Sequence, residues 1–169
     1  AGTAAAASAA PSAVALAERT DVVRAPVAGR VVSLDNVNDK VFSSRVLGEG
    51  VGIQPANGHI VSPVDGVLLT VPKSGHAFGI KTDDGVEVLV HVGIDTVRLK
   101  GEHFAVAVEK GQRVTAGQPL VEVNFDGVRA AGYDTTTLVT VTNTKAMGSV
   151  APRPEGDVQT GDPVIDVTR

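Results

Sequence analysis

Valine occupies 31 of the 169 positions, and this preference constrains the fold more than any other feature of the sequence. Valine is β-branched, which restricts its side-chain rotamers and favours strands over helices. Nineteen glycines and nine prolines punctuate the valine-rich stretches. Short β-branched segments separated by turn residues predict an all-β fold, an antiparallel β sandwich or barrel. Only minor short helices are expected, at Asp126–Ala131 and within Val37–Arg45, and a helical bundle is excluded.

Two pairs of segments repeat within the chain. Ala25–Val32 resembles Ser62–Leu69, and Lys110–Val123 resembles Glu155–Val167 with one residue deleted. Each copy has the pattern of a strand, a glycine-containing turn and a second strand. A solenoid needs at least three stacked repeats, so two copies of each unit predict a pseudo-symmetric barrel-sandwich hybrid. Chance repetition of common turn sequences is the alternative.

The first 20 residues have a different composition, dominated by alanine with interspersed serine, glycine and proline. Such a segment buries too little apolar surface to offset its ordering entropy, so we predict a linker over residues 1–20 and one domain over residues 21–169. It lacks the basic and strongly apolar regions of a signal peptide. Because the chain begins with Ala1 and its single methionine is Met147, we expect it to be part of a longer polypeptide.

Charge and composition exclude several function classes. The formal net charge is −4 and no cluster of lysine and arginine is present, so neither nucleic acid nor an anionic membrane surface is an expected partner. The chain has no cysteine, which excludes disulfides, thiolate nucleophiles and cysteine-based metal sites. No apolar run approaches the roughly 18 residues of a membrane-spanning helix, so we expect no direct membrane insertion.

The most informative segment runs from Ser74 to Val97 and has the pattern of a β-hairpin. Asp83-Asp84-Gly85 is a turn signal, and valine occupies every second position from Val86 to Val92. Because side chains alternate between the two faces of a strand, these valines are predicted to face the core. Leu89 and His91 then share the opposite, outward face.

The length of the hairpin loop determines whether His76 and His91 meet. A two-residue loop at Asp83-Asp84 places them directly opposite, with Cβ atoms roughly 4.5–5.5 Å apart. A two-residue loop at Asp84-Gly85 makes them diagonal neighbours on one face, still within side-chain reach. A three-residue loop would send one side chain to the other face. Two of these three registers predict a histidine pair.

Two adjacent imidazoles suit phosphoryl transfer. A neutral imidazole is a competent nucleophile near neutral pH, and a second imidazole can donate a hydrogen bond to an anion held on the first. The carbonyl of Gly93 is placed to accept from Nδ1 of His91, which leaves Nε2 free, and the Ser74 hydroxyl is placed to orient His76. Two alternatives stay open: an accidental meeting of surface histidines, and a zinc site, although no further ligand stands at the usual spacing. We expect no metal and no cofactor.

The segment His76-Ala77-Phe78-Gly79-Ile80 and the run from His91 to Val97, His-Val-Gly-Ile-Asp-Thr-Val, resemble a known family. It is the enzyme IIA component of the glucose family of the bacterial phosphoenolpyruvate-dependent sugar phosphotransferase system. The similarity covers about Asp21 to Arg169. The Ala-Gly-Tyr-Asp-Thr-Thr-Thr run at 131–137 is similar to β-glucoside and sucrose-type permeases, in which IIA is the C-terminal domain of a IIBCA polypeptide.

The resemblance implies that His91 accepts a phosphoryl group on Nε2 from phospho-HPr and passes it to the cysteine of a IIB domain during sugar uptake. It implies that His76 stabilises the phosphoryl group and supports onward transfer. Asp95 is implied to receive the basic face of HPr, and Ser74 stands where the family more often has threonine. The domain would then work on the cytoplasmic side, tethered to a membrane IIC domain.

The resemblance also suggests a docking surface. Phe42 and Leu89 match positions where family members carry exposed apolar residues around the histidines, and core packing is the alternative for Phe42.

A second function class is kept open by the segment around Lys145, which loosely resembles biotinyl and lipoyl swinging-arm domains that carry the cofactor on a lysine at a hairpin tip. Lys145 would be that lysine, although the residues such domains place before it are absent.

Overall fold

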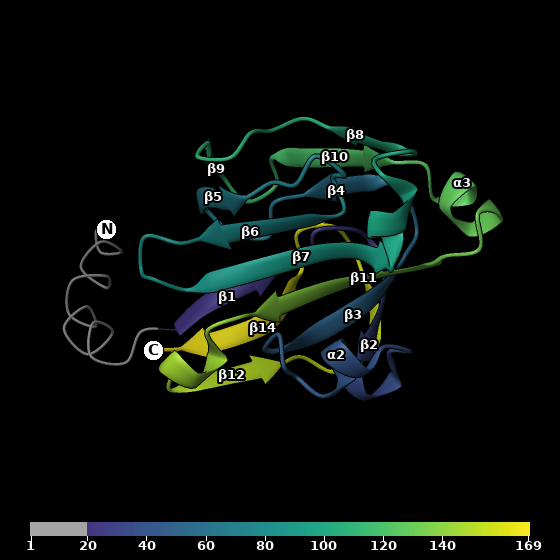
Figure 1. Cartoon of the computed structure of the whole chain (residues 1–169). Helices are drawn as coiled ribbons and strands as arrows, with labels where there is room; N and C mark the ends of the chain where they lie inside the picture. Colours follow the sequence, from purple (N-terminus) through teal and green to yellow (C-terminus); the bar gives the residue numbers. More distant parts are fainter. Residues whose placement is uncertain (1–19) are drawn as a thin grey trace, which may run out of the picture.

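The computed structural model of the chain describes residues 20–169, which form three antiparallel sheets (Figure 1). The largest sheet has eight strands. In spatial order these are β13 (Gly156–Val158), β2 (Gly29–Ser33), β3 (Glu49–Pro55), β11 (Asp134–Val141), β7 (Glu87–Ile94), β6 (Ala77–Lys81), β5 (Gly66–Thr70) and β9 (Arg113–Val114). Every strand pair in it is antiparallel.

Two three-stranded sheets complete the fold. One has the order β1 (Thr20–Arg24), β14 (Pro163–Thr168) and β12 (Ser149–Pro152), and the other has the order β4 (His59–Val61), β10 (Pro119–Val123) and β8 (Phe104–Val106). These sheets lie on different sides of the central strands in Figure 1. The predicted antiparallel all-β sandwich is confirmed.

The core between the sheets is aliphatic, as the valine content predicts. One large cluster of buried side chains joins all three sheets and contains Val23 of β1, Ile60 of β4 and Ile165 of β14. This cluster contains Val88, Val90 and Val92 of β7 and Val86 directly before that strand, which confirms the predicted alternation. Because β7 lies between β6 and β11 in the large sheet, the strand that carries His91 has paired neighbours on both sides.

The internal repeat is confirmed by the strand pairing. β1 and β2 pair with β14 and β13, and in the same way β4 and β5 pair with β10 and β9. The connecting turns match as well. Ala25 exchanges backbone hydrogen bonds with the turn at Gly161, and Ser62 exchanges the equivalent bonds with the turn at Gly117. The two sequence echoes are therefore two copies of one structural unit.

The helical elements are short, as expected. They are η1 (Leu34–Asn36), α2 (Lys40–Ser43), η2 (Thr96–Leu99), α3 (Phe125–Ala130) and η3 (Thr144–Ala146). In the described part of the chain no helix has the length and apolar character needed to cross a membrane. α2 and η1 cover part of the outer face of the large sheet, where Leu34, Val37, Phe42, Ile94 and Leu138 form a second, smaller cluster.

The predicted linker falls largely outside the described residues, which begin at Thr20. Thr20 pairs with Thr168 as the first residue of β1. β1 therefore includes the last residue of the predicted linker.

Candidate functional site

The β6–β7 hairpin has the three-residue loop, the register expected to send His76 and His91 to opposite faces. Lys81 pairs with Glu87, and the loop is Asp83-Asp84-Gly85, closed by the Thr82 N–H donating to the Val86 carbonyl at 2.9 Å. Gly85 occupies the third loop position with φ +91°, the left-handed conformation that three-residue hairpin loops require at that point. Ala77, and not His76, consequently lies opposite His91.

His76 and His91 nevertheless meet. Their ring centroids are 5.2 Å apart, with an angle of 80° between the ring planes. His76 lies one residue before β6, directly after Gly75, whose φ of +67° turns the chain. Strand alternation therefore does not fix the direction of the His76 side chain. The backbone stays tied to the hairpin, because the His76 carbonyl accepts from the Val92 N–H at 2.6 Å.

His91 is a half-buried residue on the outer face of β7. Its Nδ1 lies 2.8 Å from the carbonyl oxygen of Gly93. A carbonyl oxygen only accepts hydrogen bonds, so Nδ1 must carry the proton and, in the neutral ring, Nε2 keeps its lone pair. The Phe42 ring lies against the imidazole at a centroid distance of 5.2 Å. The ring is thus fixed in the tautomer that can attack through Nε2.

His76 has a partner of its own. The Ser74 hydroxyl lies 2.5 Å from its Nδ1. When the hydroxyl donates to Nδ1, the proton of the neutral ring is on Nε2, where it can be donated to an anion held by the neighbouring His91. The expected Ser74 contact is present.

Burial keeps both imidazoles neutral. It lowers the pKa of His91 below its ordinary value. The Gly93 carbonyl and the carboxylates of Asp39 and Asp95 raise this pKa by smaller amounts. It also lowers the pKa of His76, which the neighbouring His91 lowers further. A neutral ring at neutral pH is the form with a lone pair to offer, so the site favours the nucleophilic state of His91.

Two carboxylates act on His91, and sequence reasoning found only one of them. Asp95 was expected and is exposed in the left-handed conformation, with φ +62°, directly before η2. Asp39 was missed. Its Oδ1 caps α2 by accepting from the backbone N–H groups of Val41 at 2.9 Å and Phe42 at 3.3 Å. An aspartate in front of a predicted short helix is an N-cap signal, but the sequence alone does not place that helix end near His91.

The expectation that Phe42 is exposed is wrong, because its side chain is only 4% exposed and belongs to the small cluster under α2. It forms a wall of the histidine site instead. The exposed apolar residue of α2 is its neighbour Val41, which is 48% exposed, and Val97 of η2 is 52% exposed. Leu89 is half-buried on the same face of β7 as His91, as the alternation predicted.

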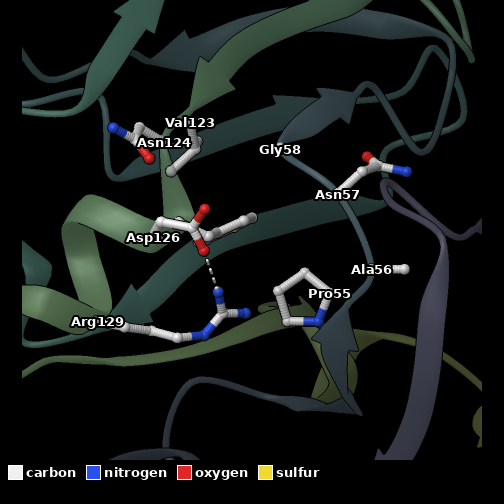
Figure 2. Close-up of a pocket in the computed structure, with 9 residues that line it drawn as sticks. Pro55, Ala56, Asn57, Gly58, Val123, Asn124, Asp126 and Arg129 are labelled. Atoms are coloured by element: carbon white, nitrogen blue, oxygen red, sulfur yellow. Dashed lines mark hydrogen bonds and ion pairs between the residues drawn. The ribbon is translucent and has the colours of Figure 1, made fainter.

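A pocket of about 240 Å³ lies elsewhere, between the β3–β4 loop and α3 (Figure 2). Its lining includes Asn57 and the ion pair between Asp126 and Arg129, in which Nη1 and Oδ1 are 3.3 Å apart. Neither histidine of the pair lines it. Within residues 20–169, no group of three or more histidine, aspartate or glutamate side chains is placed to hold a metal ion.

Comparison with known proteins identifies the family of the chain. The family model described as phosphoenolpyruvate-dependent sugar phosphotransferase system, EIIA 1, matches residues 21–147, which include the hairpin and both histidines. The chain belongs to this family.

Similar proteins include both separate EIIA components and domains of larger permeases. The chain is 40% identical to the glucose-specific EIIA component of Staphylococcus aureus over 147 residues, which cover 86% of this chain and 89% of that protein. It is 48% identical to the glucose-specific EIICBA component of Streptococcus pneumoniae over 131 residues, which are 78% of this chain and 18% of that protein. It is 42% identical to the β-glucoside-specific EIIBCA component of Bacillus subtilis over 141 residues, 79% of this chain and 23% of that protein. This EIIA chain thus spans about a fifth of the length of those two permeases.

A solved structure shares the fold. The glucose permease IIA from Mycoplasma capricolum superimposes with a TM-score of 0.78 at 37% sequence identity, over 88% of this chain and 96% of that one. The antiparallel sandwich of the EIIA chain is therefore the fold of this family.

The position of Lys145 argues against the swinging-arm alternative. Lys145 is exposed in η3, between β11 and β12. These two strands belong to different sheets and do not pair, so Lys145 is not at the tip of a hairpin. Membership of the EIIA family points in the same direction.

Proposed function

We propose that the chain is a phosphocarrier in which His91 accepts a phosphoryl group on Nε2 from phospho-HPr and passes it to the cysteine of a IIB domain during sugar uptake and phosphorylation. The observation that carries the proposal is the His91 ring, with its Nδ1–H committed to the Gly93 carbonyl and a second imidazole at 5.2 Å. Sequence similarity to EIIA components supports the same role.

In the first step, the Nε2 lone pair of His91 attacks phosphorus. The new Nε2–P bond forms as the bond from phosphorus to HPr breaks and its electron pair returns to HPr. His91 keeps its Nδ1 proton, which the Gly93 carbonyl continues to accept. In the second step, a thiolate of IIB attacks the same phosphorus, an S–P bond forms, and the Nε2 electron pair returns to the ring.

His76 stabilises the transferred group in this scheme. Negative charge accumulates on the three equatorial oxygens during phosphoryl transfer, and an Nε2–H donor beside them lowers the barrier. The Ser74 contact at Nδ1 of His76 supports this role because it allows the Nε2 proton. Gly93 and Ser74 are positioning residues for the two rings.

Partner docking would use the surface around the histidines. The carboxylates of Asp39 and Asp95 act electrostatically on His91 and suit a basic face of HPr. Val41 and Val97 add exposed apolar area, and Leu89 lies on the face of His91. Exposed apolar side chains together with carboxylates fit a transient protein interface.

The relatives suggest the setting. EIIA occurs as part of EIICBA and EIIBCA permeases in the similar proteins. We propose that residues 21–169 are such a domain, placed C-terminal to IIB and IIC on the cytoplasmic side of the membrane, with residues 1–20 as the tether.

The direct test is intact mass spectrometry. Incubation with phosphoenolpyruvate, enzyme I and HPr should add about 80 Da, the mass of one phosphoryl group, and acid should remove it. His91→Ala should add nothing. Lys145→Arg should still gain the mass, because the alternative carrier role of Lys145 predicts an acid-stable adduct on that residue. An unchanged wild-type mass, or a mass gain in His91→Ala, would refute the assignment.

A second variant separates the two histidines. His76→Gln should accept the phosphoryl group from phospho-HPr and fail to pass it to IIB. Normal phosphoryl transfer from this variant to purified IIB would contradict the proposed division of roles.

A further inference from the structure

A fully buried threonine contacts the backbone directly after His91, and neither the sequence patterns nor the proposed chemistry assigns it a role. Thr96 is 0% exposed and is the first residue of η2. Its hydroxyl donates to the carbonyl oxygen of Val92 at 2.5 Å. Buried hydroxyls are nearly always hydrogen-bonded, so a hydrogen bond here is expected. The informative observation is that its acceptor is the carbonyl of Val92.

The backbone of Val92 connects both histidines. Its N–H donates to the His76 carbonyl at 2.6 Å, and its carbonyl belongs to the peptide unit that leads into Gly93. The Gly93 carbonyl is in turn the acceptor of His91 Nδ1–H at 2.8 Å. Any rotation of the chain at Val92 and Gly93 therefore moves the group that fixes the His91 tautomer.

The methyl group of Thr96 restrains the same place from another side. Gly93 has φ +78°, and a Cβ built on it would lie 2.4 Å from Cγ2 of Thr96 and 3.0 Å from the carbonyl oxygen of Asp134. Thr96 thus holds Val92 by a hydrogen bond and packs against Gly93. The two contacts come from one side chain on a separate element, η2, so they persist only when β7 and η2 keep their relative placement.

We propose that Thr96 is a positioning residue that sets the tautomer of His91 by holding the Val92–Gly93 peptide. The proposal rests on the proposed function for its consequence, since Nε2 can attack phosphorus only when the proton is on Nδ1. Loss of the Thr96 hydroxyl leaves the Val92 carbonyl without that donor and frees the Gly93 carbonyl to turn away from the ring. His91 then loses the partner that favours the Nδ1–H form.

The test compares two variants that differ in a single hydroxyl. Thr96→Ser keeps the hydroxyl and loses the methyl group, whereas Thr96→Ala loses both. Thr96→Val, which keeps the shape and loses the hydroxyl, is a third measurement on the same question. The tautomer is read from the ¹⁵N chemical shifts of the His91 ring, which require neither HPr nor IIB.

The expected result is a predominant Nδ1–H tautomer in the wild type and Thr96→Ser, and a reduced Nδ1–H population in Thr96→Ala. The rate of phosphorylation by phospho-HPr should fall about 10-fold in Thr96→Ala, the lower end of the losses seen when a partner that orients a metal-binding histidine is removed. Thr96→Val should behave like Thr96→Ala.

Two results would overturn the inference. An unchanged tautomer in Thr96→Ala would show that the hydroxyl does not set it, and an equal change in Thr96→Ser and Thr96→Ala would assign the effect to packing alone. The outcome is separable from the proposed function, because a chain that never accepts phosphate would still report its His91 tautomer by NMR.

Discussion

Replacing Gly93 by alanine should destabilise the fold by more than backbone strain alone. Gly93 has φ +78°, and an L-residue in the left-handed region costs about 1–2 kcal/mol. The new Cβ would also lie 2.4 Å from the Thr96 methyl carbon and 3.0 Å from the Asp134 carbonyl oxygen. The Thr96 side chain cannot turn away without breaking its bond to Val92, so the clash adds about 1–3 kcal/mol as overpacking. Together these effects predict a loss of roughly 2–5 kcal/mol.

Gly85 provides a matched control in the same hairpin. Its φ is +91°, and a Cβ built there meets nothing within 4 Å. Gly85→Ala therefore carries the backbone strain of about 1–2 kcal/mol without the clash. The difference between the two variants measures the packing of Thr96 and Asp134 against Gly93.

Urea denaturation at neutral pH, analysed by linear extrapolation, gives the free energy of unfolding of both variants. Thr96→Ser should restore part of the stability lost in Gly93→Ala, because it removes the methyl group that the new Cβ meets. Equal losses in Gly93→Ala and Gly85→Ala, or no recovery in the double variant, would refute the reasoning.

Three further predictions concern the histidine site. Phe42→Ala should lose about 3–5 kcal/mol of unfolding free energy and the exposed Val41→Ala no more than about 0.5 kcal/mol, measured by urea denaturation; similar losses would contradict the burial of Phe42. Ser74→Ala should slow sugar phosphorylation through IIB about 10-fold while Ser74→Thr keeps the rate, because only the former removes the partner of His76 Nδ1. Because burial lowers the pKa of both His76 and His91, the unfolded chain takes up protons before the folded one, so stability should fall as the pH drops below about 6.5. A variant with both histidines changed to glutamine should lose less unfolding free energy as the pH drops below about 6.5, as measured by urea denaturation. The same pH dependence in this variant and the wild type would count against the burial argument.

Several parts of the site could be predicted from the sequence because they are local. The Gly93 carbonyl is two residues from His91, and the Ser74 hydroxyl is two residues from His76. Contacts at this separation depend on a few backbone dihedrals, so residue types and spacing are enough to anticipate them. The same holds for the valines of β7, whose burial follows from strand alternation.

The hairpin register shows where this reasoning fails. Asp83-Asp84-Gly85 is compatible with two-residue and three-residue loops, and a shift of one residue reverses which face a side chain occupies. The structure has the three-residue loop, yet His76 still meets His91 because Gly75 turns the chain before β6 begins. The correct pairing of the histidines was thus predicted from an incorrect register.

The sequence by itself determined the strand-rich class, the duplicated unit, the alternation of β7 and the two local partners of the histidines. Only the tertiary structure decided that Phe42 is buried against His91, that Asp39 acts on that ring, and that the Thr96 hydroxyl donates to the Val92 carbonyl. The physical reason is the separation of the groups in space and sequence. Contacts between α2, η2 and β7 depend on how whole elements pack, and many packings are compatible with the same local preferences.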